Sequence, residues 1–170
     1  MVLPYPFTRI LVPTDFSTCS DAALALAGKL AGDQGAELCV LHVVEHTGLP
    51  GDAVIHPPAY PSGIAVAEYT ERLAIQALTS RLKGTELPPT RTRTKVLHGA
   101  PGKLIPAYAD EIGASLIVMG THGRSGLAHM LAGSIAEKLV RTSLIPVMTV
   151  REPVCREQPL DPGLDGERDG

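Results

Sequence analysis

Short apolar runs alternate along this chain with longer segments in which apolar residues recur at helical spacing. The runs have the length and composition of β-strands and cover residues 9–13, 37–44, 90–97, 115–120 and 144–150. Helical patterns follow residues 17, 101 and 134 and occupy 65–83. Strands that alternate with helices favour right-handed crossovers and a parallel sheet. The pattern therefore predicts an α/β fold, a doubly wound, Rossmann-like parallel sheet with helices on both faces.

The ends of two predicted helices carry recognisable capping residues. Ser17 precedes the first helical pattern and is expected to cap it, while Gly32 and Gly35 supply its stop. Ser134 and Glu137 have the spacing of a capping box at the start of the last helix. These residues predict where the first and last helices begin.

The third helix contains a departure from good helical sequence. Pro106 lies five residues after Pro101, and a proline inside a helix costs about 3 kcal/mol because it removes a hydrogen bond and crowds the preceding turn. The helix can start late, near Ile105, or bend at the proline. We favour an irregular first turn, with residues 108–112 helical and Gly113 as the stop.

Several segments indicate edges, loops and a tail. Residues 45–63 are rich in proline and glycine and predict a long surface loop, which is either a lid or partner site or a plain mobile connection. The strand at 90–97 alternates polar and β-branched residues, which favours an edge position. Pro146, in the last strand, likewise indicates an edge. We expect a single domain over 1–151 and a disordered tail over 152–170.

Composition narrows the function classes. The 170 residues are 44% hydrophobic but only 4% aromatic, without tryptophan, which is typical of a helix-covered sheet built from aliphatic residues. The net charge of −3 comes from interspersed acidic and basic residues, so we expect no nucleic-acid partner. No apolar run approaches the ~18 residues of a membrane span, and the start of the chain lacks a signal-peptide pattern. We therefore expect a cytoplasmic protein without a membrane partner.

Cysteines and histidines give no metal pattern. Cys19, Cys39 and Cys155 form an odd set without metal-type spacing, which favours reduced thiols. His42 and His46 are four residues apart but straddle the end of a strand, where that spacing does not place both on one face. No zinc site is predicted.

A glycine-rich stretch follows the strand at 115–120. Gly120 would let the chain turn, Gly123 would remove a Cβ where backbone N–H groups meet anionic oxygens, and Gly133 with Ser134 would open a helix with unpaired donors. The stretch predicts binding of a phosphate chain; the alternative is that these glycines serve turns and helix packing. The Walker phosphate loop and the dinucleotide Gly-x-Gly-x-x-Gly signature are both absent.

Three segments resemble the universal stress protein family, in particular its ATP-binding branch. They are the spacing Gly120, two residues, Gly123, nine residues, Gly133-Ser134; the sequence Val12-Pro13-Thr14-Asp15-Phe16-Ser17; and Leu41-His42-Val43-Val44. The resemblance covers residues 9–151. It implies strand order 3-2-1-4-5, in which a ligand binds where the order reverses, at the carboxyl ends of the first and fourth strands.

The resemblance also implies a set of nucleotide-binding residues, and no catalytic ones. They are Pro13, Thr14, Asp15, Val43, Met119, Gly120, His122, Gly123, Arg124, Gly133, Ser134 and Ile135. Val43 and Ile135 would act through their main chains. Asp15 would bind ribose or help to hold a metal, unless it merely caps a helix, and Arg124 either neutralises phosphate charge or is a solvated loop residue.

These residues support three hypotheses about function. The leading one is a universal stress protein that binds ATP, with Mg²⁺ on the phosphates, as a nucleotide-dependent regulatory module. The second is slow ATP hydrolysis or phosphoryl transfer, although no residue stands out as a base that would orient water. The third is an interaction module that binds no nucleotide. The family resemblance and the apolar edge at Leu144 to Val150 both predict a homodimer through the last strand.

Overall fold

The computed structural model describes residues 6–45, 48–83, 85, 91–121 and 134–151. Its main sheet has five strands in the order β5-β2-β1-β6-β7, and every neighbouring pair is parallel. The strands are β1 (Arg9–Pro13), β2 (Glu37–Val44), β5 (Thr92–His98), β6 (Leu116–Gly120) and β7 (Val147–Val150). This confirms the predicted order, in which the third, second, first, fourth and fifth main strands lie side by side.

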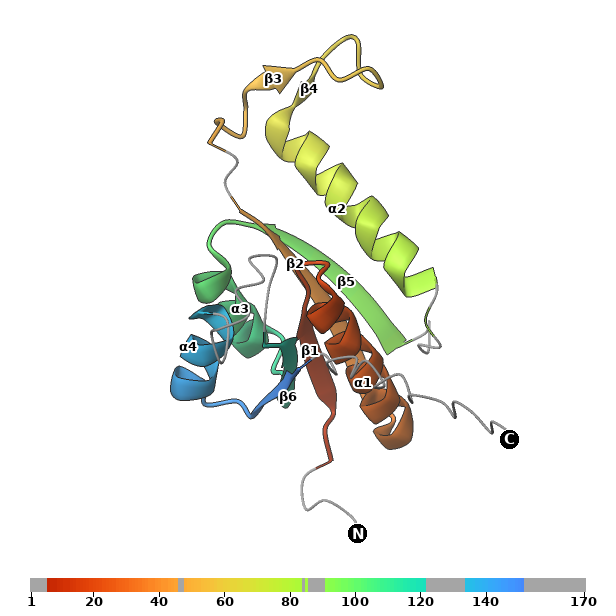
Figure 1. Ribbon diagram of the computed structural model, residues 1–170, viewed down its shortest axis with the longest axis vertical. Coiled ribbons are helices and arrows are strands. Elements are labelled where there is room, and N and C mark those ends of the chain that lie inside the picture. Colours follow the sequence, from red (N-terminus) through yellow and green to blue (C-terminus); the bar gives the residue numbers. More distant parts are fainter. Residues whose placement is uncertain (1–5, 46–47, 84, 86–90, 122–133, 152–170) are drawn as a thin grey trace, which may run out of the picture.

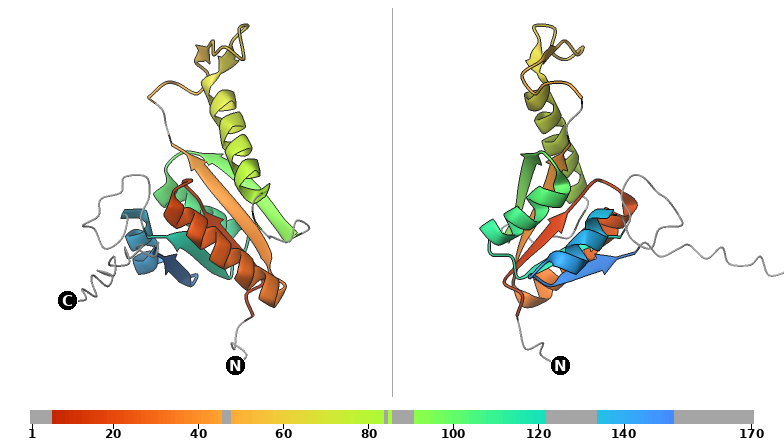
Figure 2. Two further views of the ribbon diagram at one scale, coloured as in Figure 1. Left: turned by 45° about the vertical axis from the view of Figure 1, so that its right-hand side comes forward. Right: turned by 90° about the vertical axis from the view of Figure 1, so that its left-hand side faces the viewer.

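Two helices cover each face of the sheet (Figures 1 and 2). The helices α1 (Thr18–Gln34) and α2 (Val66–Lys83) pack on one face, and α3 (Pro101–Glu111) and α4 (Ser134–Thr142) pack on the other. Successive residues of β1 point to opposite faces, so Ile10 and Val12 join the core under α1 and α2 while Leu11 joins the core under α3 and α4. The doubly wound α/β prediction is confirmed.

Capping residues fix the ends of α1 as the sequence predicts. The Ser17 hydroxyl accepts a hydrogen bond from the Ser20 N–H, and Gly35 ends the helix in the left-handed conformation with φ 67°. Gly32 lies inside the helix rather than at its stop. The cap places the first turn of α1 shortly after the end of β1.

The prediction for the third helix is wrong at its start. The helix α3 begins at Pro101 and runs regularly through Pro106 to Glu111. A proline at the first helical position is favourable, since its missing N–H has no partner within a helix and its φ is already helical. Ile105 and Ala109 are buried against the sheet, and their burial offsets the hydrogen bond lost at Pro106. Gly113, with φ 60°, follows the helix as expected.

The segment 45–63 is less irregular than predicted. It contains β3 (Val54–Ile55), which pairs antiparallel with β4 (Ile64–Ala65) in a small hairpin that leads into α2 (Figure 1). Gly63, with φ 89°, directly precedes β4. The last strand is also shorter than predicted, because β7 begins at Val147, after Pro146. Both β5 and β7 are edge strands, as expected.

Three findings on the described residues concern membrane spans, metal ligands and thiols. Within them, every helix is too short or too polar to cross a bilayer, and no group of three or more metal-ligating side chains is found. Cys19 and Cys39 are buried free thiols, and burial raises the pKa of the Cys39 thiol. Cys155 and the predicted tail at 152–170 lie outside the described residues.

Candidate functional site

The carboxyl ends of β1, β2 and β6 lie next to one another at the centre of the sheet. The chain leaves β1 for α1 on one face, and it leaves β6 for α4 on the other, so the strand order reverses between β1 and β6. In open parallel sheets, ligands bind at this point, outside the carboxyl ends of the strands. Pro13 and Gly120 are the last residues of β1 and β6. The topology therefore brings the two predicted sides of the site to one edge.

A hydrogen-bonded turn, residues 14–17, connects β1 to α1. The Thr14 N–H donates to the Leu41 carbonyl at 2.8 Å and extends the pairing with β2 by one bond. The buried Thr14 hydroxyl then accepts the Phe16 N–H at 3.1 Å and lies 3.0 Å from the Ser20 hydroxyl. Thr14 thus fastens the start of the turn to both the sheet and the first turn of α1.

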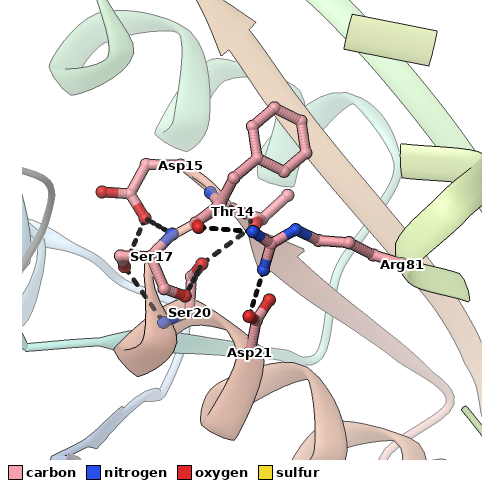
Figure 3. A network of polar contacts seen from close by, with 7 residues as sticks. Thr14, Asp15, Ser17, Ser20, Asp21 and Arg81 are labelled. Carbon is pink, nitrogen blue, oxygen red and sulfur yellow. Dashed lines mark hydrogen bonds and ion pairs between the residues drawn. The ribbon is translucent and has the colours of Figure 1, made fainter. Parts of the chain in front are cut away.

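Asp15 lies within this turn, with a defined carboxylate orientation. Its Oδ1 accepts the Ser17 N–H at 3.1 Å and the Ser17 hydroxyl at 2.6 Å (Figure 3). Ser17 itself caps α1, so Asp15 helps to hold the cap but is not the cap. These contacts give Asp15 a structural role beside the cap, and its role toward a ligand stays a prediction.

His42 supports the turn from β2. Its ring Nδ1 lies 2.8 Å from the Thr14 carbonyl oxygen, and because a carbonyl can only accept, Nδ1 carries the hydrogen. The Phe16 ring stacks on the imidazole with centroids 4.3 Å apart and planes at 29°. The sequence argued against a zinc site at His42 and assigned no other role to its side chain, and the structure gives it a buried structural role beside the site.

Val43 is placed to present its main chain at this edge. The pairing of β1 with β2 ends at Pro13 opposite Leu41. Main-chain groups of alternate residues in a parallel strand point to the same neighbour, and Leu41 points to β1 while Val44 accepts from Gly99 on the other side. The N–H and C=O of Val43 therefore point to the β1 side, one step beyond the last pair. Its side chain packs against the core under α3 and α4.

Gly120 serves helix packing, which is one of the alternatives that the sequence left open. It is not among the residues with positive φ, so the chain does not need glycine there for a turn. A Cβ at this position would lie 2.8 Å from the main-chain carbonyl carbon of Cys19 in α1. The glycine thus permits close packing of α1 on the end of β6. Met119 is buried in the opposite core.

Two further predicted site residues lie at the start of α4. The helix runs from the carboxyl edge back along the sheet, because it connects β6 to the parallel strand β7. Ser134 is its first residue, and Ile135 packs its side chain against the core under α3 and α4. A helix N-terminus carries main-chain N–H groups without helical partners. His122, Gly123, Arg124 and Gly133 lie outside the described residues.

One residue that contacts the turn at residues 14–17 was not predicted from the sequence. Arg81, near the end of α2, donates to the Phe16 carbonyl at 2.7 Å and pairs with the Asp21 carboxylate (Figure 3). These partners are 65 and 60 residues away along the chain. Arg81 belongs to an ordinary amphipathic helix pattern, so nothing in the local sequence distinguishes it from a solvated arginine.

A comparison with protein families identifies the fold. The model of the universal stress protein family matches residues 6–151 of this chain. The chain belongs to the universal stress protein family. The universal stress protein MJ0531 of Methanocaldococcus jannaschii is 32% identical over 147 residues, which are 86% of this chain and 84% of that protein.

Solved structures of the family have the same architecture. The universal stress protein UspA from Lactobacillus plantarum matches with a TM-score of 0.66 and 27% identity, covering 86% of this chain and 99% of that one. A universal stress protein in complex with cAMP matches with a TM-score of 0.58 and 25% identity, covering 86% of this chain and 98% of that one. The fold and the family resemblance drawn from the sequence are both confirmed.

Proposed function

We propose that this universal stress protein binds ATP at the carboxyl ends of β1, β2 and β6 and acts as a nucleotide-dependent regulatory module in a stress response. The observation that carries the proposal is the fixed turn at residues 14–17, which lies where the strand order reverses. A turn already held by hydrogen bonds loses little conformational freedom on binding. The family member in complex with cAMP supports an adenine nucleotide as the ligand class.

Adenine would be recognised by the main chain of Val43. Adenine offers an amino donor beside a ring-nitrogen acceptor, and a strand residue offers one C=O and one N–H on the same side. Both groups of Val43 point to the β1 side beyond the end of the pairing. Guanine carries a carbonyl acceptor where adenine carries its amino donor, so the same main-chain groups disfavour GTP.

The ribose and phosphates would extend from there across β1 towards β6 and α4. The Asp15 carboxylate is oriented by Ser17 and can accept hydrogen bonds from ribose hydroxyls. The N-terminus of α4 at Ser134 favours anionic oxygens. The predicted contributions of His122, Gly123, Arg124 and Gly133 remain part of the proposal.

Mg²⁺ would fit this site only if the phosphates of the nucleotide supplied oxygen ligands to it. Mg²⁺ prefers oxygen ligands and keeps several waters, using one or two carboxylates besides the substrate phosphates. Among the described residues, Asp15 follows the end of β1 and Glu45 follows the end of β2, and no cluster of three ligating side chains is found; Asp15 is the carboxylate in the hydrogen-bonded turn. Asp15 would therefore contribute one ligand, and the ion would offset phosphate charge when it is bound.

The test is to measure nucleotide binding directly. Purified protein is denatured and any released nucleotide is identified by mass spectrometry; the apo protein is then titrated with ATP and with GTP by calorimetry. We expect ATP to bind more tightly than GTP and to raise the melting temperature, because a ligand selective for the native state stabilises it. Absence of binding at millimolar ATP contradicts the proposal.

A matched pair of variants locates the site. Asp15→Ala should weaken ATP binding about tenfold, the effect of losing a hydrogen bond to a charged group. Asp33→Ala removes an exposed aspartate at the opposite end of α1 and should leave the affinity unchanged. Equal affinities of the two variants would place ATP elsewhere.

We also propose a homodimer in which β7 of one copy lies beside β7 of the other. The two edges of the sheet differ: β5 carries exposed charged residues, Arg93 and Lys95, whereas β7 from Val147 to Val150 carries none. Charged side chains protect an edge strand from pairing with another chain, and an uncharged edge lacks that protection. This difference supports β7 as the edge that is paired.

A further inference from the structure

Arg81 joins α2 to the turn at the candidate site through three kinds of contact. Its Nη2 donates to the Phe16 carbonyl at 2.7 Å, and its Nη1 pairs with the Asp21 carboxylate in the first turn of α1. Its guanidinium carbon lies 5.4 Å from the centre of the Phe16 ring. Figure 3 shows the side chain reaching between the turn and α1. One side chain of α2 thus holds the turn and the helix that follows it.

The residue that Arg81 holds has an unusual backbone conformation. Phe16 has φ 65°. In the described part of the chain, every other residue with positive φ is a glycine. This left-handed conformation brings the Cβ of an L residue close to its own carbonyl oxygen, so it persists only where the surroundings impose it. Here the N–H is held by Thr14, the ring by His42 and the carbonyl by Arg81.

The conformation of Phe16 determines where Asp15 lies. Asp15 and Ser17 flank Phe16 and are hydrogen bonded to each other across it, through both the N–H and the hydroxyl of Ser17. If Phe16 relaxed to a common backbone conformation, Ser17 would turn away and the two hydrogen bonds to Asp15 would break. Arg81 therefore acts on Asp15 without touching it.

We propose that Arg81 is a positioning residue of the nucleotide site: it keeps Phe16 in the left-handed conformation that presents the Asp15 carboxylate to the ligand. This inference rests on the function proposed above. The Arg81 side chain is 34% exposed, and a partly exposed ion pair such as the one with Asp21 contributes little by itself. The hydrogen bond to the Phe16 carbonyl and the contact with the Phe16 ring are therefore the contacts that hold Phe16 in place.

The experiment compares three variants of the full chain. Arg81→Ala removes all three contacts and should weaken ATP binding about tenfold. Arg81→Lys keeps the positive charge but loses the planar fork that contacts Phe16 and Asp21 together, so its affinity for ATP should lie between those of the alanine variant and the unchanged protein. Arg72→Ala is the matched control on the same helix, because Arg72 pairs with Glu68 and lies 5.5 Å from the Tyr60 ring, away from the turn. It should bind ATP like the unchanged protein.

A second measurement does not depend on any ligand. The main-chain N–H of Ser17 donates to Asp15, and that of Ser20 donates to Ser17. In the apo protein, Arg81→Ala should make hydrogen exchange at these two amides at least about tenfold faster, because the turn opens more often. Amides in β2, which lies in the same sheet, serve as the reference for overall stability and should change less.

The outcomes separate this proposal from the function it rests on. If the unchanged protein binds no ATP, the proposed function fails, and the exchange rates alone then decide whether Arg81 positions the turn. If ATP binds and Arg81→Ala leaves its affinity unchanged, the positioning role is wrong. Exchange at Ser17 and Ser20 that is unchanged in Arg81→Ala also overturns it.

Discussion

At the scale of single residues, the close approach of α1 to β6 depends on one missing side chain. A Cβ on Gly120 would lie 2.8 Å from the Cys19 carbonyl carbon, 2.9 Å from its Cβ and 3.0 Å from its carbonyl oxygen. Two of these are main-chain atoms of a helix, which cannot move alone. The glycine therefore brings the capped start of α1, and with it Asp15, close to the end of β6.

Replacing Gly120 should be costly for this reason. We expect Gly120→Ala to lower the free energy of unfolding by about 1–3 kcal/mol, the usual cost of overpacking, as measured by urea denaturation. Gly32→Ala is the control, since a Cβ on Gly32 meets nothing within 4 Å and the residue lies inside α1. That variant should gain about 0.5–1 kcal/mol. A Gly120→Ala variant as stable as the unchanged protein would show that the helix shifts without cost.

The roles of some residues could be predicted from the sequence, and the roles of others could not. Ser17 was identified as a cap because its role depends on residues only three positions away. For Gly120, helix packing was one of the predicted alternatives, but its partner Cys19 could not be predicted because the two residues lie far apart in the chain. Arg81 was missed because its partners lie on another element altogether.

At the scale of elements, α3 shows how burial overrides a local penalty. Pro106 removes one main-chain hydrogen bond from the helix, yet the helix is regular from Pro101 onward. Ile105 and Ala109 flank the proline and are 4% and 0% exposed. Propensity alone predicted a late start, because the packing that stabilises the first turns was not visible in the sequence.

Restoring the missing donor should stabilise the helix. Pro106→Ala provides an N–H that can donate to the Gly102 carbonyl one turn earlier, so we expect the free energy of unfolding to rise by about 1–3 kcal/mol. Pro101→Ala, at the first helical position, should change it by less than about 1 kcal/mol because that N–H has no helical partner. Thermal and urea unfolding measure both. A loss of stability in Pro106→Ala would mean that the ring itself packs usefully.

The hairpin of β3 and β4 could not be predicted from local pattern either. Each strand has two residues, which is too short for the alternation of apolar and polar positions that identifies a strand. Its closure depends on Gly63, where a Cβ would lie 2.6 Å from the Val54 side chain. The composition of 45–63 correctly excluded long elements but left this pairing undetermined.

At the scale of the whole molecule, the order of the strands follows from few features. Alternating strands and helices with right-handed crossovers predicted a parallel sheet, and the family resemblance supplied the order that the structure confirms. The order makes β1, β2 and β6 neighbours and leaves β5 and β7 at the edges. Which strands form the edges depends on the order of the assembled sheet, whereas the charged and uncharged residues of β5 and β7 can be read from the sequence.

The two edges give the homodimer a direct test. Pro146 accepts a hydrogen bond from Ile117 in β6, and Val150 accepts one from Thr121 directly after β6. Main-chain groups alternate in direction along a strand, so those of Thr149 point outward. By the same alternation, Thr94 points outward on β5, because Gly99 donates to Val44 on β2. Proline at an outward position removes an edge donor without breaking the bonds within the sheet.

We expect light scattering at micromolar concentration to give about twice the 17.9 kDa chain mass for the unchanged protein and for Thr94→Pro. Thr149→Pro should give the mass of one chain, because it removes a donor from the edge that pairs and its ring crowds an approaching strand. Circular dichroism verifies that both variants fold. A dimer that persists in Thr149→Pro would place the interface on another surface, and a monomeric unchanged protein would leave the uncharged edge of β7 without a partner of its own kind.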